Sequence, residues 1–134
     1  MRLLKILSLT FFLITVFIFS SCKKDEGQGG KASITGKVWI KRYNITGTVV
    51  VGEYAGTYED VYIIYGEDES YGAKVQTNPD GIFEFKYLRP GKYKVYAYSE
   101  GTSITTANRK AVIKDVEISD KKQTVDAGTI EIVK

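Results

Sequence analysis

Apolar and polar residues alternate with a period of two along most of the chain, from residue 32 to residue 133. This is the period of a strand, in which successive side chains point to opposite faces, and no long stretch has apolar residues at helical spacing. The residues of the expected inward phase are Ile34, Gly36, Val38 and Ile40, then Val61, Ile63 and Tyr65, then Ala73, Val75 and Thr77, then Phe83 and Phe85, then Tyr93, Val95 and Ala97, and then Val112, Val116 and Ile118, with an interruption near Ile113. A last strand is expected through residues 124–125 and 130–133. Seven or eight short strands predict an all-β protein, a single antiparallel β-sandwich.

Two proline-containing turns separate strong strand patterns. The first consists of Asn78, Pro79, Asp80 and Gly81. Proline suits the second position of a type I turn, and Gly81 can adopt the left-handed conformation that the hairpin requires next. The second contains Pro90 and Gly91 and is predicted to be a type II turn.

Three segments carry a resemblance to a known family. They are residues 34–38 (Ile-Thr-Gly-Lys-Val), 78–85 (Asn-Pro-Asp-Gly-Ile-Phe-Glu-Phe) and 88–95 (Leu-Arg-Pro-Gly-Lys-Tyr-Lys-Val). Together they resemble the carboxypeptidase regulatory-like domain, of transthyretin-like (prealbumin-like) fold, over residues 32–134. The resemblance implies a usually non-catalytic β module of the kind attached to peptidases, outer-membrane transporters or surface proteins. It indicates the fold more strongly than the function.

Residues 42–60 depart from the pattern of that family, in which a few residues join the first two strands. This insertion contains the run Thr48-Val49-Val50-Val51 and is either an extra edge strand with a loop or an extended hairpin. Because loops carry function more often than core strands do, we expect the particular role of this protein to depend on it.

The first 21 residues have a different pattern. Arg2 and Lys5 precede residues 6–19, a run of 14 uncharged and mostly apolar residues. The run is shorter than the ~20 residues that span a bilayer, but it has the length of a signal-peptide core. The expected organisation is a lipoprotein signal peptide at 1–21, a lipidated cysteine and flexible tether at 22–31, and the sandwich domain at 32–134.

Cys22 is the single cysteine, and with the small residues before it residues 19–22 resemble the lipobox of bacterial lipoproteins. The resemblance implies that Cys22 becomes the first residue and carries acyl chains that anchor the protein stably in a membrane. Lys24, Asp25 and Glu26 resemble the signal that exports lipoproteins to the surface of some Gram-negative bacteria; otherwise they are a solvated spacer. We expect an anchor in the bacterial outer membrane that faces outward, with a periplasm-facing anchor as the alternative.

Composition excludes several function classes. Without residues 1–21, the chain has 17 Lys and Arg residues and 16 Asp and Glu residues. This nearly neutral charge argues against a nucleic-acid binder. The absence of histidine excludes a histidine base, a Ser-His-Asp triad and a histidine metal ligand. A single cysteine excludes an internal disulfide. We expect no enzyme and no cofactor, and no metal site either. The acidic run at residues 67–69 offers oxygen ligands for calcium, but a solvated hairpin tip is the preferred interpretation.

Four aromatic residues alternate opposite to the inward positions of their strands: Trp39, Tyr62, Tyr96 and Tyr98. Exposed rings on a sheet can stack on sugar rings or anchor a protein partner. Cross-strand aromatic pairs also stabilise sheets by about 0.2–1 kcal/mol each, which is the structural alternative. These four residues are therefore a possible binding face.

The expected function is that of a non-enzymatic binding or accessory module, anchored to the membrane by its lipid, which docks a partner protein of the cell envelope through an edge strand or the insertion at residues 42–60. One alternative is a structural, pilus-like subunit that assembles by strand donation. Another is a surface glycan-binding module, which depends on the tyrosines.

Overall fold

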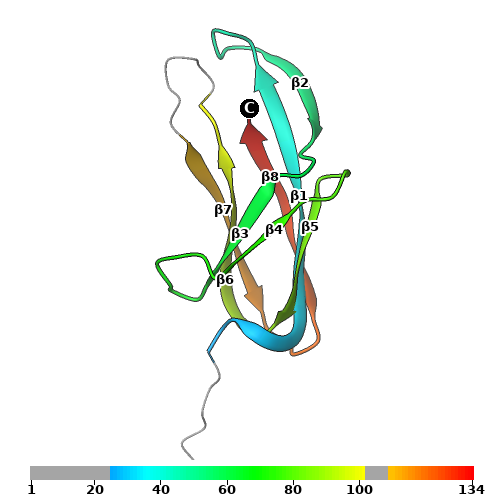
Figure 1. Ribbon diagram of the computed structural model, residues 1–134, viewed down its shortest axis with the longest axis vertical. Coiled ribbons are helices and arrows are strands. Elements are labelled where there is room, and N and C mark those ends of the chain that lie inside the picture. Colours follow the sequence, from blue (N-terminus) through cyan, green and yellow to red (C-terminus); the bar gives the residue numbers. More distant parts are fainter. Residues whose placement is uncertain (1–24, 102–108) are drawn as a thin grey trace, which may run out of the picture.

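The computed structural model describes residues 25–101 and 109–134, and Cys22 and Lys24 of the predicted anchor lie outside them. The described chain forms strands and connecting loops, as predicted (Figure 1). The strands are β1 (Gln28–Tyr43), β2 (Val50–Ala55), β3 (Asp60–Tyr65), β4 (Ala73–Gln76), β5 (Ile82–Leu88), β6 (Gly91–Ser99), β7 (Lys110–Ile118) and β8 (Thr124–Val133). In these two ranges no helix is long and apolar enough to cross a membrane.

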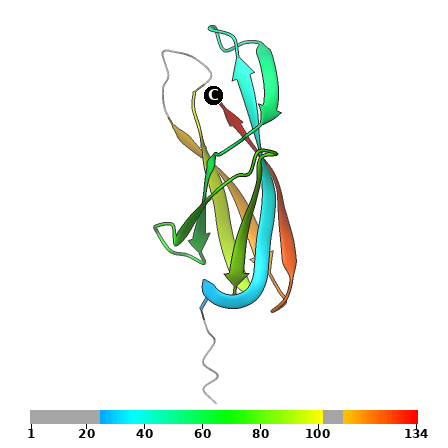
Figure 2. The same cartoon turned by 45° about the vertical axis from the view of Figure 1, so that its right-hand side comes forward.

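The strands form two four-stranded sheets packed face to face, which confirms the predicted all-β sandwich (Figure 2). In the first sheet, β1 is central: it pairs with β8 along one edge and with β5 and then β2 along the other. The second sheet has the order β4-β3-β6-β7. We call them sheet A and sheet B.

One pairing differs from the predicted antiparallel arrangement, because β8 runs parallel to β1. The other five pairings of the described strands are antiparallel. The physical reason is that β7 belongs to sheet B and β8 to sheet A. Their connection therefore crosses the sandwich instead of closing a hairpin, and β8 is free to align with β1.

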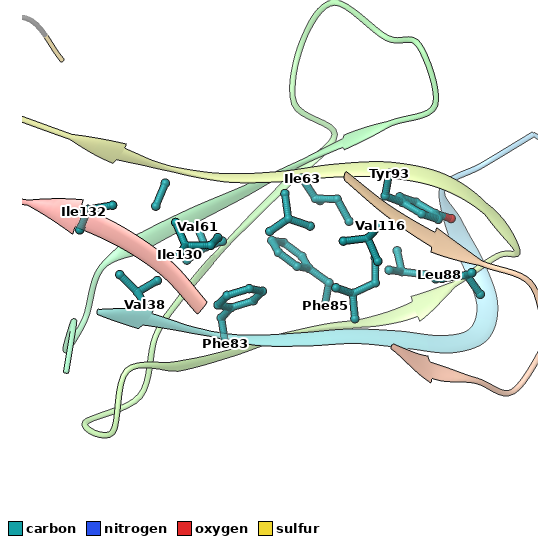
Figure 3. Close-up of a cluster of buried hydrophobic side chains, with 14 of the residues drawn as sticks. Val38, Val61, Ile63, Phe83, Phe85, Leu88, Tyr93, Val116, Ile130 and Ile132 are labelled. Carbon is teal, nitrogen blue, oxygen red and sulfur yellow. The ribbon is translucent and has the colours of Figure 1, made fainter. Parts of the chain in front are cut away.

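The core fills the space between the sheets with side chains of the predicted inward phase (Figure 3). The members that lie deepest include Ile34, Val38, Val61, Ile63, Phe83, Tyr93, Val95 and Ile130. The alternation of β7 continues without the expected interruption. Val112, Val116 and Ile118 share the inward phase, and Ile113 lies exposed on the outer face, opposite Tyr96.

The first predicted turn is confirmed. The amide of Gly81 donates to the carbonyl of Asn78 at 2.9 Å, and the side-chain oxygen of Asn78 accepts from the amides of Asp80 and Ile82. Gly81 has a φ of 77°, and a Cβ there would lie 2.6 Å from the carbonyl oxygen of Val38. Only glycine fits this position without displacing β1.

The segment with Pro90 and Gly91 is not the predicted type II turn. It carries the chain from β5 in sheet A to β6 in sheet B, and the φ of Gly91 is 149° instead of the ~80° of that turn. The carbonyl of Arg89 accepts a hydrogen bond from the Tyr93 hydroxyl at 2.6 Å. The crossing is thus held by a buried tyrosine four residues further on, which also bonds to the backbone of Gly27, and a local turn pattern does not contain this arrangement.

The insertion at residues 42–60 combines the two predicted alternatives, an extra edge strand and an extended hairpin. β1 and β2 form an extended hairpin that projects beyond the body of the sandwich, and β2 is an edge strand of sheet A (Figure 1). The hairpin loop is closed by Asn44, whose side-chain oxygen accepts from the amides of Thr48 and Val49 at 2.9 and 3.2 Å.

The folded body begins before residue 32, which corrects the predicted tether. β1 starts at Gln28, and the amide of Gly27 donates to the Tyr93 hydroxyl at 3.0 Å. The carbonyl of Asp25 accepts from Arg89, and a carboxylate oxygen of Glu26 accepts from the amide of Lys92. The glycine-rich residues 27–30 therefore belong to the sandwich. The backbone of this segment reaches partners on β6 and on the β5–β6 crossing, which sequence alone does not place nearby.

Candidate binding surfaces

The first surface is a cluster of tyrosines on the outer face of sheet B, formed by Tyr62, Tyr71, Tyr96 and Tyr98. Tyr62 and Tyr96 are cross-strand partners, and their rings stack with centroids 5.1 Å apart. The ring of Tyr98 meets both of them edge-on at 5.5 Å, and the ring of Tyr71 meets Tyr62 at 5.0 Å. We call this cluster the tyrosine face.

The tyrosine face is tightly packed and carries cations at its border. Tyr96 is only 7% exposed, and burial, reinforced by the neighbouring phenol of Tyr98, raises the pKa of Tyr96 to about 12. The ammonium of Lys74 lies 6.0 Å from the centre of the Tyr62 ring, and the guanidinium of Arg109 lies 4.8 Å from that of Tyr98. The predicted sheet-stabilising role of these rings is therefore met by Tyr96, which has little surface left for a ligand.

Trp39 does not join this cluster. It belongs to β1 in sheet A, with its neighbour Lys37 4.8 Å from the ring and its indole nitrogen 3.5 Å from a carboxylate oxygen of Glu53. The single binding face predicted from alternation is thus divided between two sheets. Alternation shows that a residue points outward but not which sheet it belongs to.

A cleft of about 250 Å³ adjoins the tyrosine face at the end of the sheet where Asp60 begins β3 and Gln76 ends β4. Three of its lining residues are tyrosines: Tyr58, Tyr62 and Tyr98. The others are charged or carry an amide, namely Glu59, Asp60, Gln76, Glu100, Arg109 and Lys134. No aliphatic side chain lines this cleft within the described parts of the chain, so it is a polar site with aromatic walls.

The charges of the cleft are largely compensated by ion pairs. Lys134 contacts Glu59 at 2.7 Å, and Lys74 contacts one oxygen of Asp60 at 3.0 Å. The hydrogen bond from Lys74 lowers the pKa of Asp60, which is therefore ionised at neutral pH. The other carboxylate oxygen of Asp60 is buried and accepts no hydrogen bond from the residues described. Because this oxygen has almost no accessible surface, it is covered by the protein and is not open to the cleft.

Tyr58 is held at the mouth of the cleft in a strained conformation. It has a φ of 55°, which is rare for a bulky residue, and its side chain is 66% exposed. The backbone around it is fixed by Thr77, which is 2% exposed: its hydroxyl accepts from the amide of Glu59 at 2.8 Å and donates to the carbonyl of Gly56. Sequence analysis missed this corner. The one signal was a threonine at an inward position of a strand.

The second surface is the β1–β2 hairpin, where aliphatic and aromatic side chains are exposed. They are Ile45, Val49, Val50, Val51 and Tyr54, of which Ile45 is 78% and Val51 61% exposed. Val50 and Val51 are neighbours on β2 and point to opposite faces, so both faces of this strand are open. No strand of residues 25–101 or 109–134 pairs with the outer edge of β2.

The acidic run at residues 67–69 lies in the β3–β4 loop, where Glu67 is 3.5 Å from Lys94. Across the described residues, no group of three or more Cys, Asp or Glu side chains is placed to hold a metal ion. No residue of either surface has the arrangement of a metal site, and we assign no cofactor to them.

The two packed sheets define this chain as a β-sandwich module. Residues 40–129 match the family described as BOS complex subunit NOMO1-like, second beta sandwich domain, and the chain belongs to this family. The matched range contains the hairpin and most of the cleft. The predicted class of module is therefore confirmed, whereas the finer assignment to the carboxypeptidase regulatory-like type stays a prediction.

One solved structure with a similar fold is that of a Pseudomonas aeruginosa protein described as a candidate carbohydrate-binding protein. The two chains are 14% identical with a TM-score of 0.48, and the match covers 81% of this chain and 91% of that one. So distant a likeness carries no argument about ligands. No curated protein matches this chain significantly.

Proposed function

We propose that this protein is a lipid-anchored, non-enzymatic module of the bacterial cell envelope that docks a partner protein through its β1–β2 hairpin. The observation that carries the proposal is the concentration of exposed apolar side chains on this one hairpin. Exposed apolar side chains gathered on one element are costly in water and mark interaction sites.

The docking mode follows from the position of β2. An unpaired edge with apolar residues on both sides is a template for an added strand, whose backbone bonds give affinity while side-chain pockets give specificity. The partner should therefore supply an extended segment with alternating apolar side chains. The docked strand would cover Val51 and Tyr54, which are exposed in the isolated chain.

The geometry also fits an anchor at the N-terminus. The described chain begins at Asp25, at the end of the sandwich opposite the hairpin (Figure 1). A lipid on Cys22 would thus hold the hairpin away from the membrane, in reach of a partner. The outer face of the outer membrane is the proposed location, with Lys24, Asp25 and Glu26 as the export signal.

Two further points support a binding role. The chain has no histidine, and the acidic residues Glu59 and Asp60 of the cleft are engaged by lysines. In addition, the description of the matched family names a subunit of a complex. A role as an accessory subunit agrees with that description.

The test is site-specific photocrosslinking in intact cells, with the crosslinking amino acid at Val51 and, as a matched control, at Tyr87. Tyr87 is 71% exposed but lies on β5 near the anchored end. One protein captured from Val51 and not from Tyr87 is the expected result. Capture of nothing, or equal capture from both positions, contradicts docking through the hairpin. Capture of a second copy of this chain from Val51 would establish the pilus-like alternative instead.

The anchor has a separate test. Metabolic labelling with a fatty-acid analogue should label the wild-type protein and not a Cys22→Ala variant, and the variant should leave the membrane fraction. Labelling of the variant would show that Cys22 is not the lipidated residue.

A further inference from the structure

A second ligand site, unrelated to the hairpin, is present on sheet B. We infer that the cleft between Tyr58 and Tyr98 binds one neutral sugar ring, with Tyr58 as the stacking platform and Asp60 and Gln76 as hydrogen-bonding groups. The inference does not depend on partner docking, because the two surfaces share no lining residue.

The size and lining of the cleft select this class of ligand. Its volume of about 250 Å³ is just below the roughly 300–1,000 Å³ of sites for drug-sized molecules, so it suits one ring. A pyranose has an apolar C–H face and a rim of hydroxyl groups. The cleft offers the complement, since tyrosine rings provide apolar faces and the remaining lining is polar.

The electrostatics favour a neutral ligand over an ion. The ammonium of Lys134 is paired with Glu59, and the guanidinium of Arg109 lies on the ring of Tyr98. The lining also holds three carboxylates, Glu59, Asp60 and Glu100, so the cleft has no excess of positive charge for a phosphate or carboxylate. The carboxylate of Asp60 and the amide of Gln76 both line the cleft, where they can accept from a sugar hydroxyl, and the amide can also donate.

The polar lining also argues against a peptide anchored by an apolar side chain. Such a peptide needs an apolar pocket, and among the described residues the cleft contains no aliphatic side chain. A hydroxyl-rich ligand loses least on entering, because the polar side chains of the lining can replace some of its hydrogen bonds to water.

The strained corner at Tyr58 explains why the site is ready to bind. An exposed aromatic ring in a left-handed conformation is unfavourable for the free protein, by about 1–3 kcal/mol for the backbone alone. Thr77 fixes the corner from beneath through two hydrogen bonds. The backbone that carries the ring is therefore positioned in advance, which reduces the ordering cost of binding.

The experiment is an NMR titration of the full-length protein in detergent with neutral oligosaccharides built from glucose, galactose, mannose or N-acetylglucosamine, and with the acidic polymer alginate. At least one neutral oligosaccharide should shift the resonances of Tyr58 and Gln76, with little dependence on salt. No shift with any neutral sugar overturns the inference. Binding of alginate alone, lost at high salt, overturns it as well, because it would show an anion site.

Matched variants locate the site. Tyr58→Ala and Gln76→Ala should each weaken binding, Tyr58→Ala by about tenfold or more, whereas Tyr58→Phe, which keeps the ring, should stay within about threefold. The control is Tyr87→Ala, because Tyr87 is likewise an exposed tyrosine of positive φ, at 60°, but lies outside the cleft. Equal weakening by Tyr87→Ala contradicts a specific site. Thermal unfolding of each variant verifies that it is folded, and crosslinking from Val51 should be unchanged in all of them.

Discussion

The hairpin and the cleft both expose side chains that would be more stable when covered, but they are supported in opposite ways. In the hairpin, β2 pairs with β1 alone, and the loop between them is closed by the side chain of Asn44. The cleft lies on a four-stranded sheet, and the backbone next to its exposed tyrosine is fixed by a buried hydroxyl. One surface is apolar and open on both faces, and the other is polar and shaped in advance.

This difference shows what each surface can recognise. An open strand edge gains most of its order from the partner that covers it, so it suits a protein segment of adjustable shape. A fixed polar cleft loses little entropy on binding and can hold a small ligand that offers few contacts. Substitutions at positions that support one surface, both surfaces or neither should show whether the hairpin and the cleft act independently.

The largest effect is expected from Gly81→Ala, because Gly81 supports both surfaces. A Cβ there would lie 2.6 Å from the carbonyl of Val38 and 3.0 Å from the amide of Gly56, which bond to each other where β2 meets the cleft corner. The left-handed strain and this contact should lower the free energy of unfolding by about 3 kcal/mol. Urea denaturation measures the loss, and a value below about 1 kcal/mol would show that the turn relaxes.

Thr77→Val should have the next largest effect and should disturb the cleft alone. The substitution keeps the shape of the side chain but leaves the amide of Glu59 and the carbonyl of Gly56 without their partner, at a cost of about 2 kcal/mol. Hydrogen exchange at Glu59 should accelerate, while exchange in β2 stays as in the wild type. Thr77→Ser retains the hydroxyl and should keep Glu59 protected. Faster exchange in both variants would mean that the hydroxyl is not what fixes the corner.

A smaller effect concerns pH and the tyrosine face. Because burial raises the pKa of Tyr96 to about 12 while the unfolded value is about 10, the folded protein binds more protons than the unfolded chain between these values. Stability should therefore fall as pH rises from about 10 to about 12. Tyr96→Phe removes this group, and the pH dependence of its unfolding should be shallower in that window. An unchanged slope would assign the loss to other tyrosines such as Tyr93, whose pKa burial also raises.

The smallest effect on stability is expected from Val51→Lys on the hairpin. The side chain is mostly exposed, so the free energy of unfolding should change by no more than about 0.5 kcal/mol. With the crosslinking amino acid moved to Tyr54, which is also exposed on β2, capture of the partner should be lost nevertheless, because a charge would meet the apolar segment that covers β2. Retained capture at wild-type level would show that the partner binds elsewhere.

Much of the fold could be predicted from the sequence because its signals are local. The alternation in β1, β3, β5 and β6 placed residues such as Val38, Phe83 and Val95 in the core, and the turn at Gly81 followed from its own residues. The parallel course of β8 and the crossing at Pro90 were missed. Both depend on which sheet a strand joins, and a period of two is the same in either sheet.

The candidate sites were predictable only in part, for the same reason. Alternation identified Tyr62, Tyr96 and Tyr98 as outward residues, and they do form one cluster. It grouped Trp39 with them, although β1 belongs to the other sheet. Alternation did not identify Tyr58, because the backbone beside it is fixed by a hydrogen bond from the amide of Glu59 to Thr77, 18 residues further along the chain, that no local pattern reports.

The continuity of β1 has a mechanical consequence. This strand of 16 residues runs from the end where the described chain begins to the hairpin at the opposite end (Figure 2). If the membrane holds one end and a partner the other, tension passes along a single covalent strand instead of through the packing between sheets. The hydrogen bonds of β1 to β5 and β8 would carry little of this load, because neither neighbouring strand lies between the two points of attachment. The domain would then transmit a pull between the membrane and the partner without unfolding.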